Sequence, residues 1–274
     1  MTGDIKLKKL DHLAEIYTLY DTFIIDLWGV IHDGIRLNPR AIEAVDNLMI
    51  NKKKVIFLSN APRPSVEVKK FLNKLNMEER YLKNILTSGE AAMQALQDHK
   101  YGKFFFHVGP KRDDSVFLKI KKNNTSLEKS NFILCTGLYD DHEDDLNYYK
   151  ELLKNHTDKK LICTNPDLTV HRGDIEEYCA GSIAKVFESI GGEVIYFGKP
   201  YKEIYKMCFK AGEKTIAIGD NLNTDIRGAN NMYIDSIFIT NGVHRAEFKD
   251  DNELAALSLK YKVKASYYQP QLIW

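Results

Sequence analysis

The sequence predicts an α/β protein with a Rossmann-like parallel-sheet core and an inserted α/β domain, here called the cap. Three observations carry this prediction. Short apolar runs alternate with stretches at helical spacing. Several runs end on polar or charged residues, as strands do at the carboxyl edge of a parallel sheet, where α/β proteins bind ligands. Between the second and third of these strand ends lies a segment long enough for a domain of its own.

The N-terminal residues 1–20 are expected to form an amphipathic helix. Their apolar side chains recur at helical spacing: Leu7, Leu10, Leu13, Ile16, Tyr17 and Tyr20. We expect this helix to pack on the core, and a partner-binding helix is the alternative. The segment is polar overall and lacks the apolar stretch of a signal peptide.

The first part of the core, residues 1–88, continues with apolar runs and helix-start signals. The apolar run that begins at Phe23 ends on Asp26, and the chain then turns at Gly29. Pro39 is acceptable early in a helix, and Ser65 and Ser88 are good helix caps. We therefore expect strands at 52–59 and 84–87, with helices over 38–50, 65–75 and 88–97.

Residues 89–195 are expected to form the cap, and residues 196–274 the second part of the core. In the cap we expect strands at 103–108, 131–136, 160–164 and 193–196, with helices at 144–154 and 181–189. The last of these strands could instead lead back into the core. Residues 111–129, rich in charged and polar side chains, are expected to contain an exposed turn. The second core part should contain helices at 202–211 and 224–231, with strands at 214–219 and 233–239.

Polar side chains gather where four apolar runs end. They are Asp26, the pair Ser59-Asn60, Lys199, and Asp220 followed by Asp225. In one parallel sheet these groups would meet at the same edge. Converging carboxylates need a hard cation such as Mg²⁺ between them, while a lysine and a serine suit phosphoryl oxygens. The set indicates metal-assisted phosphoryl transfer, in which an Asp can form an aspartyl-phosphate.

From about Asp21 to Gly242 the chain resembles the haloacid dehalogenase superfamily, in the class whose cap lies between the second and third motifs (class IIA), which implies that the cap is of the C2 type. That is the group of the nucleotide and pyridoxal phosphate phosphatases. The resemblance implies roles for five residues: Asp26 as nucleophile, Ser59 as phosphate-binding hydroxyl, Lys199 as stabilising lysine, Asp220 as metal-binding acid and Asp225 as second acid of the fourth motif. It also implies that the backbone carbonyl of Trp28 binds the metal, and that Asn60 donates to phosphate beside Ser59.

Trp28 departs from the family pattern. The family's usual second Asp, the general acid and base, would stand at this position. Trp28 could form a wall of the substrate pocket and stack on a flat leaving group, or it could be an apolar plug that lowers catalysis. His32 and Asp33 lie just downstream and could replace the acid, or they could be ordinary loop residues. Members that cleave carbon–halogen or carbon–phosphorus bonds also lack the second Asp.

In the cap, the sequence Thr164-Asn165-Pro166-Asp167 resembles a turn that faces the core site in this class. Asn165 and Asp167 are therefore candidate substrate-binding residues. The alternative is a local turn in which an Asn side chain bonds its own backbone. The acidic run at 140–145 could suggest a second metal site, but it is better explained as the negative first turn of a solvated helix.

Composition excludes several other classes. The 274 residues carry a net charge of +1, which gives no reason to expect nucleic acid or an anionic membrane as partner. No apolar run is long enough to span a bilayer. The four cysteines show no CxxC pairing, which favours reduced, buried thiols in a cytoplasmic protein. The expected partner is a small phosphorylated metabolite; the sequence leaves the oligomeric state open, with a homodimer as one option.

Together these features favour a Mg²⁺-dependent hydrolase, acting as a phosphatase of a small phosphorylated metabolite through an aspartyl-phosphate. Two alternatives stay open: hydrolysis of a different, phosphonate-like bond, and a catalytically weak protein that binds a phosphorylated ligand. A phosphotransferase is less favoured. Asp220 and Asp225 argue against a dehalogenase, which needs no metal. The cap would choose the substrate, which the sequence does not name.

Overall fold

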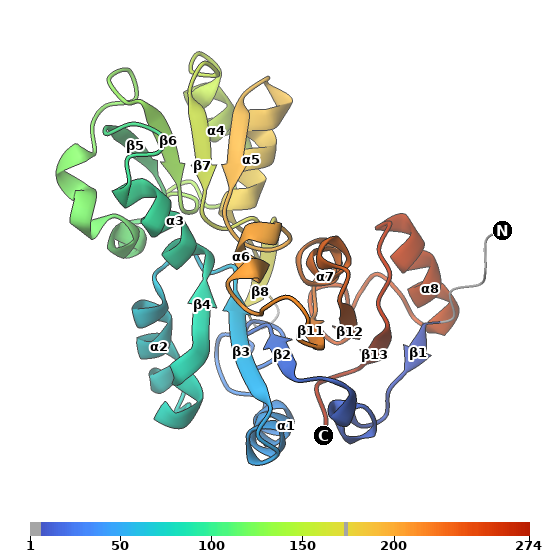
Figure 1. The fold of residues 1–274 in the computed structure, drawn as a ribbon. Coiled ribbons are helices and arrows are strands. Elements are labelled where there is room, and N and C mark those ends of the chain that lie inside the picture. The colour runs from blue at the N-terminus through green and yellow to red at the C-terminus, as the bar shows by residue number, and fades with distance from the viewer. Residues whose placement is uncertain (1–6, 173–174) are drawn as a thin grey trace. The chain divides into compact units, whose positions relative to one another are not determined.

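The computed structural model describes residues 7–172 and 175–274, and the chain forms two compact units (Figure 1). The first unit contains the described residues up to Leu58, together with Leu75–Ile85 and Pro200–Trp274. The second unit contains Ser59–Lys74 and Leu86–Lys199. Each unit is built around its own parallel sheet, as the alternation of apolar runs predicts.

A seven-stranded sheet forms the centre of the first unit. Its order is β1 (Lys8–Lys9), β13 (Tyr267–Gln269), β12 (Asp235–Ile239), β11 (Thr215–Gly219), β2 (Thr22–Ile25), β3 (Lys54–Ser59) and β4 (Ile85–Thr87). From β1 to β3 every neighbouring pair runs parallel. All residues of β2 and β11 are buried, because strands at the centre of a parallel sheet are covered on both faces. The candidate residues Asp26 and Asp220 directly follow these two strands.

The helices of this unit include α1 (Pro39–Ile50), α6 (Lys202–Lys206), α7 (Arg227–Met232) and α8 (Asp251–Lys260). It also contains the short 3₁₀ helices η1 (Leu13–Glu15), η2 (Tyr17–Leu19) and η3 (Glu79–Asn84), and the π-helical turn η6 (Leu222–Ile226). Helix α1 starts where the sequence predicts it, because the Asn38 side chain accepts from the N–H of Arg40 and Pro39 takes the first helical position. Helix α8 packs its Leu254 and Leu257 against β12 and β13.

The expected N-terminal amphipathic helix is wrong for the described residues 7–20. This stretch forms β1 and the turns η1 and η2 instead. The error is physical in origin, since short 3₁₀ turns repeat about every three residues and so place apolar side chains at nearly helical spacing. Packing on the core is nevertheless confirmed: Leu10, Leu13 and Ile16 are buried.

The second unit contains a four-stranded parallel sheet in the order β10 (Glu193–Tyr196), β7 (Lys160–Cys163), β6 (Phe132–Cys135) and β5 (Phe105–Val108). Successive side chains of each strand point to opposite faces of this sheet. Ile133 and Cys135 of β6 face helices α4 (Leu146–Leu153) and α5 (Ala180–Ser189). Phe132 and Leu134 lie in a second cluster with Leu96 of α3 (Ser88–Gln97).

Three further features of this unit bear on the sequence analysis. Strand β10 pairs with β7, so the apolar run before Lys199 belongs to this smaller sheet and not to the sheet that carries Asp26. Residues 111–129 form η4 (Lys111–Val116) and η5 (Leu118–Asn123), with Phe117 buried. An antiparallel hairpin, β8 (Thr169–Arg172) with β9 (Ile175–Tyr178), was not anticipated.

Helix α2 (Ser65–Lys74) follows a strand of the large sheet but belongs to the second unit. Local bonds explain this assignment. Thr87 donates its hydroxyl to the carbonyl of Arg63, and both the N–H and the hydroxyl of Ser65 donate to Glu90 of α3. The segment between Ser59 and α2 is therefore held by the start of α3.

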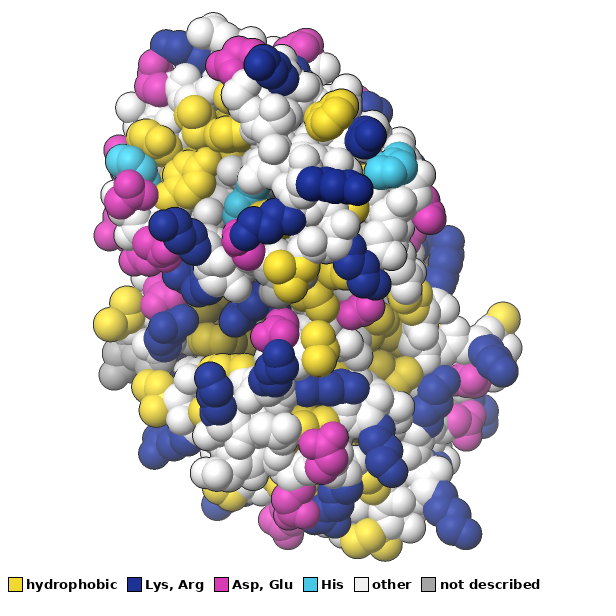
Figure 2. Space-filling model, turned by 90° about the vertical axis from the view of Figure 1, so that its left-hand side faces the viewer, with side chains coloured by type: hydrophobic (Ala, Val, Ile, Leu, Met, Phe, Trp, Pro, Cys, Tyr) yellow, Lys and Arg dark blue, Asp and Glu magenta, His cyan; other side chains and the backbone are white. Residues whose placement is uncertain are grey.

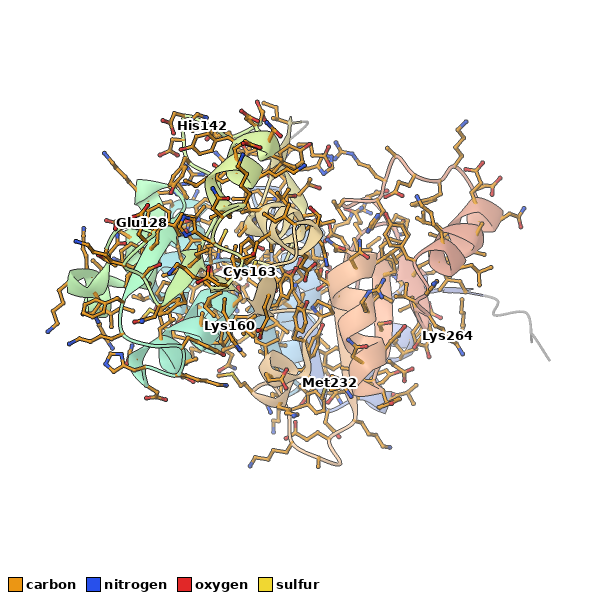
Figure 3. All side chains as sticks on the ribbon, turned by 90° about the horizontal axis from the view of Figure 1, so that it is seen from above. Glu128, His142, Lys160, Cys163, Met232 and Lys264 are labelled. Atoms are coloured by element: carbon orange, nitrogen blue, oxygen red, sulfur yellow. The ribbon has the colours of Figure 1, made fainter. Side chains whose placement is uncertain are left out.

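Surface and burial agree with the composition. On the face drawn in Figure 2, basic and acidic side chains are interspersed, and neither sign forms a continuous patch. All four cysteines are buried thiols that form no disulfide, as expected. In Figure 3, Lys160 and Cys163 mark the two ends of β7. Within the described residues, no helix combines the length and the apolarity needed to cross a membrane.

Candidate active site

Three buried carboxylates converge at the carboxyl edge of the seven-stranded sheet. Asp26 follows β2, Asp220 follows the parallel neighbour β11, and Asp225 lies in the π-helical turn η6. One oxygen from each of the three carboxylates lies within 4.8 Å of the others. Their side chains are buried, with exposed fractions of 8%, 6% and 3%. The convergence expected from the strand ends is therefore observed; we call these three residues the acidic cluster.

Glycines make room for the acidic cluster. A Cβ at Gly29 would lie 2.0 Å from an oxygen of Asp220, and one at Gly219 would lie 2.1 Å from the carboxyl carbon of Asp225. Gly29 also has a φ of +83°, which a side chain would disfavour. A third glycine, Gly242, approaches Asp220 equally closely. The turn after β2 and the end of β11 thus require glycine for the carboxylates to meet.

Backbone N–H groups fix two of the three carboxylates. The N–H of Val243 donates to Oδ2 of Asp220 at 2.9 Å, and the N–H of Asn221 donates to Oδ2 of Asp225 at 3.1 Å. Asp225 is in the first turn of η6, where an acid also interacts favourably with the N–H groups at the start of a helix. The structure shows both features at once, because this turn also brings Asp225 into the acidic cluster.

The acidic cluster fits a divalent cation. Three buried carboxylates so close together repel one another strongly unless a positive charge offsets them. Oxygen ligands and a glycine-lined site suit Mg²⁺, which prefers carboxylates and water. The residues that would hold it are Asp26, Asp220 and Asp225, with the backbone carbonyl of Trp28 as a further candidate.

The indole of Trp28 packs on its own loop. Its ring lies edge-on to His32, with ring centroids 5.0 Å apart. A Cβ at Gly34 would lie 2.7 Å from the indole, so only glycine fits there, and Gly34 has a φ of +86°. The loop is closed by the N–H of Gly29, which donates to the carbonyl of His32 at 2.8 Å. Trp28 is half-buried, so it is both a packing residue and partly accessible.

Neither residue considered as a replacement acid is in its acidic form at neutral pH. Burial lowers the pKa of His32 to about 4, although Asp33 opposes this shift, and its Nδ1 accepts from the N–H of Gly34. Burial alone would raise the pKa of Asp33, but bonds from the N–H groups of Arg36 and Ile35 outweigh it and lower the pKa. Both side chains therefore stabilise the loop, and neither supplies a proton readily.

In the second unit, Asn60 joins Lys199 to the cap turn. Its amide oxygen accepts from the N–H of Lys199 at 2.7 Å, and its amide nitrogen donates to the carbonyl of Lys199 at 3.1 Å. The same nitrogen donates to Oδ1 of Asp167 at 3.2 Å. The Asn60 amide is thus engaged with protein partners on both ends, and Lys199 itself is buried at 3% exposure. The predicted phosphate-binding pair and the lysine are neighbours, although they follow strands of different sheets.

Ser59 ends β3, and its hydroxyl accepts from the N–H of Ala61 at 3.1 Å. A hydroxyl that accepts from the backbone still has its own hydrogen to donate. Gly198 makes the approach of Asn60 to Lys199 feasible, because a Cβ there would lie 2.6 Å from the Asn60 oxygen. The segments 59–60 and 198–199 therefore form one structural piece.

The cap turn is an Asn-initiated turn held by helix α5. Oδ1 of Asn165 accepts from the N–H of Asp167 at 3.1 Å, the local bonding considered as the alternative to substrate binding. The N–H of Gly181 donates to the carbonyl of Asp167, and a Cβ at Gly181 would lie 2.4 Å from that oxygen. The side chain of Asn165 therefore serves the turn, while Asp167 lies beside Asn60.

The acidic run at 140–145 lies just before helix α4. Asp145 caps α4, and its side chain accepts from the N–H of Tyr148 at 3.0 Å. Among the residues that the structure describes, the acidic cluster is the one group of three or more acids, histidines or cysteines that could hold a metal. Within the run only Asp145 has a helix role, as the N-cap, and the first turn of α4 contains no acid, so the predicted negative first turn is wrong.

Sequence reasoning missed His244, which lies beside the acidic cluster. Its Nε2 accepts from the N–H of Leu222 at 3.1 Å, and its Nδ1 lies 2.6 Å from Oε1 of Glu247. The residues around His244 form no recognisable sequence motif. The available signal was the spacing His244–Glu247 in a turn that follows the predicted strand 233–239.

Two family models match the chain: a haloacid dehalogenase-like hydrolase model at residues 23–121, and a second model of the same kind at residues 196–260. The first matched region contains Asp26 and Ser59. The second contains Lys199, Asp220 and Asp225. The chain belongs to the haloacid dehalogenase-like hydrolases. As a member of this family the chain is a hydrolase, and its inserted α/β unit agrees with the cap expected of class IIA.

Individual relatives agree with this family. A haloacid dehalogenase-like hydrolase from Brucella suis 1330 is 27% identical, with a TM-score of 0.85 over 96% of this chain and 100% of the other. The 5'-nucleotidase YutF from Bacillus subtilis is 23% identical, covering 85% of this chain and 92% of its own length. Phosphoglycolate phosphatase 1A of Arabidopsis thaliana is 24% identical over 86% of this chain and 73% of its own.

Proposed function

We propose that this hydrolase is a Mg²⁺-dependent phosphatase that acts on a small phosphorylated metabolite through an aspartyl-phosphate at Asp26. The observation that carries the proposal is the acidic cluster, whose three buried carboxylate oxygens lie within 4.8 Å of one another. The names of two relatives, a 5'-nucleotidase from Bacillus subtilis and a phosphoglycolate phosphatase from Arabidopsis thaliana, support the same reaction class.

The residues would act as follows. A carboxylate oxygen of Asp26 attacks phosphorus in line, the bond from phosphorus to the leaving oxygen breaks, and the phosphoryl group is transferred to Asp26. Water then attacks the phosphorus of the aspartyl-phosphate, which releases inorganic phosphate and regenerates Asp26. When bound, Mg²⁺ would offset negative charge on the phosphoryl oxygens and on the attacking carboxylate.

Ser59 and Lys199 would bind the phosphoryl oxygens. The hydroxyl of Ser59 can donate one hydrogen bond while it accepts from Ala61, and the ammonium of Lys199 brings a positive charge in a buried setting. Asn60 would hold the backbone of Lys199 in place through its two bonds to that residue. We place Asp167 on the substrate side of the cap, where it lies beside Asn60, and Asn165 in a supporting role.

Trp28 favours a second candidate function. Without an acid at that position, the protein could turn over slowly and act as a binding protein for a phosphorylated ligand. A screen of phosphorylated metabolites with Mg²⁺ separates the two. Steady release of phosphate supports the phosphatase, whereas a ligand that binds tightly and stays intact with Mg²⁺ supports the binding protein.

Removing the metal should abolish phosphate release. We expect chelation to lower the rate by at least about 10²-fold and added Mg²⁺ to restore it, because three repelling carboxylates cannot orient Asp26 for attack without an offsetting charge. Asp220→Asn should weaken Mg²⁺ binding, measured by calorimetry, and Asp98→Asn on the exposed end of α3 is the matched control. Full activity in the presence of a chelator would contradict the metal role.

A further inference from the structure

We propose that His244 is a positioning residue that holds the loop 220–225 in the shape that brings Asp220 and Asp225 together, and thereby sets the affinity for Mg²⁺. The inference rests on the proposed metal role of the acidic cluster. The ring nitrogens of His244 are bonded to Leu222 and Glu247, so the ring acts on the two carboxylates through the backbone between them.

The contact to the loop is a side-chain bond to a backbone donor. Leu222 is the first residue of η6 and lies between Asp220 and Asp225 in sequence. The N–H groups in the first turn of a helix have no partner within the helix. Nε2 of His244 accepts from this N–H at 3.1 Å, and the imidazole is buried at 5% exposure. Loss of the acceptor would leave a buried donor without a partner, which is costly.

A second set of contacts fixes which nitrogen accepts. Nδ1 of His244 lies 2.6 Å from Oε1 of Glu247, so Nδ1 carries the hydrogen and Nε2 is left as the acceptor. Glu247 is itself held by Lys260 at 3.0 Å and by the hydroxyl of Tyr261. Burial lowers the pKa of His244, although Glu247 opposes this shift. Glu247 therefore fixes the orientation of the neutral imidazole, and Nε2 stays directed at the loop 220–225.

The segment that carries His244 also touches Asp220 directly. The N–H of Val243 donates to Oδ2 of Asp220, and a Cβ at Gly242 would lie 2.1 Å from that oxygen. Residues 242–244 thus contact the Asp220 carboxylate at one end and the Leu222 backbone at the other. The ring of His244 is packed by Tyr261, with centroids 4.8 Å apart. A rotation of this ring away from Leu222 would release the loop that spaces Asp220 from Asp225.

Two amide substitutions distinguish the roles of the two ring nitrogens of His244. The oxygen of Gln in His244→Gln can reach the position of Nε2 and accept from Leu222. The shorter side chain in His244→Asn reaches only the position of Nδ1, so it keeps the contact to Glu247 and loses the one to Leu222. We expect His244→Asn to weaken Mg²⁺ binding by about 10–100-fold, the effect typical of outer residues that orient metal ligands. His244→Gln should bind Mg²⁺ nearly as tightly as the wild type.

Calorimetric titration of the substrate-free full chain with Mg²⁺ measures the affinity without reference to activity. His244→Phe keeps the ring volume but has no acceptor, so it provides a second variant that should bind weakly if His244→Asn does not fold. His99→Asn, at an exposed position in the other unit, controls for the substitution itself. Thermal unfolding of the metal-free proteins checks that the compared variants are folded.

The outcomes are distinct. Weak Mg²⁺ binding by His244→Asn or His244→Phe, with affinity rescued in His244→Gln, supports the inference. Equal affinities in all folded variants, or equal losses in His244→Gln and His244→Asn, overturn it. A wild-type chain that binds no Mg²⁺ would instead refute the proposed metal site, and that result appears in the wild-type titration before any variant is compared.

Discussion

Asp26→Asn is expected to lower the rate of phosphate release by about 10⁴-fold or more, because it removes the atom that attacks phosphorus. The amide has the size of the carboxylate but is a very poor nucleophile. Substrate binding should survive, since Ser59 and Lys199 are unchanged. The loss should therefore fall on kcat, with KM changed little, in steady-state assays at saturating Mg²⁺.

Asp26→Asn should also change the thermal stability of the protein, which tests whether the three carboxylates of the acidic cluster repel one another. Asp26→Asn removes one of three mutually repelling buried charges. The metal-free variant should unfold at the same temperature as the wild type or a higher one, while its stabilisation by Mg²⁺ should shrink. Asp98→Asn is the matched control and should change neither activity nor stability. Retention of more than about a tenth of the wild-type kcat would exclude Asp26 as the nucleophile.

The second large effect concerns the leaving group. A general acid contributes about 10²–10⁴ in rate, and most when the leaving group is poor. Trp28 occupies the position of that acid, and at neutral pH His32 is a neutral imidazole and Asp33 is ionised, so neither is an effective general acid. Phenyl-type and acyl phosphates should therefore be hydrolysed much faster than alkyl phosphates. A series of phosphate esters with graded leaving groups measures this dependence.

Trp28→Asp should narrow the gap between good and poor leaving groups by restoring the acid. Removing the indole also frees the loop that it packs against, at His32 and Gly34. Trp28→Asn loses the same packing but cannot donate a carboxyl proton, so it is the matched control. Only Trp28→Asp should gain on alkyl phosphates, once Mg²⁺ is saturating for both variants. A flat wild-type dependence, with chemistry shown to limit the rate, would mean that another group already supplies the proton.

The sequence predicted the parts of the site that directly follow strands. Asp26 and Asp220 each follow an apolar run, and these two runs form neighbouring strands of the sheet. The carboxyl ends of parallel strands lie at one edge of a sheet, whatever the conformation of the connecting loops. Gly29 and Gly219 are visible in the same runs, and the structure shows that they make room for the carboxylates. Here local sequence and fold point to the same answer, so little other information was needed.

Other features depended on contacts between distant segments. The apolar run before Lys199 fits either sheet, and its pairing with β7 is decided by packing that a single sequence does not display. The clamp of Asn60 on Lys199 joins residues far apart in the chain. His244 is likewise recognisable only once the turn after β12 is seen beside η6. Positioning residues of this kind carry no motif because their partners are backbone groups.

Some missed elements did have local signals. Helix α8 starts at Asp250, whose side chain accepts from the N–H groups of Asn252 and Glu253, and the spacing of an Asp and a Glu three residues apart is typical of a helix start. Strands β8 and β9 are separated in sequence by a Gly and an Asp, a common hairpin signal. The N-terminal segment shows the opposite case, because its apolar spacing is shared by helices and 3₁₀ turns.

The stereochemical course at phosphorus tests the central claim most directly. A phosphate ester made chiral at phosphorus with sulfur and oxygen isotopes is hydrolysed in isotopically labelled water, and the configuration of the released thiophosphate is determined. Attack by Asp26 followed by attack of water gives two in-line displacements, each of which inverts phosphorus. We therefore expect overall retention of configuration, even if the aspartyl-phosphate never accumulates. Inversion would show that water attacks the substrate directly, and it would contradict an aspartyl-phosphate at Asp26.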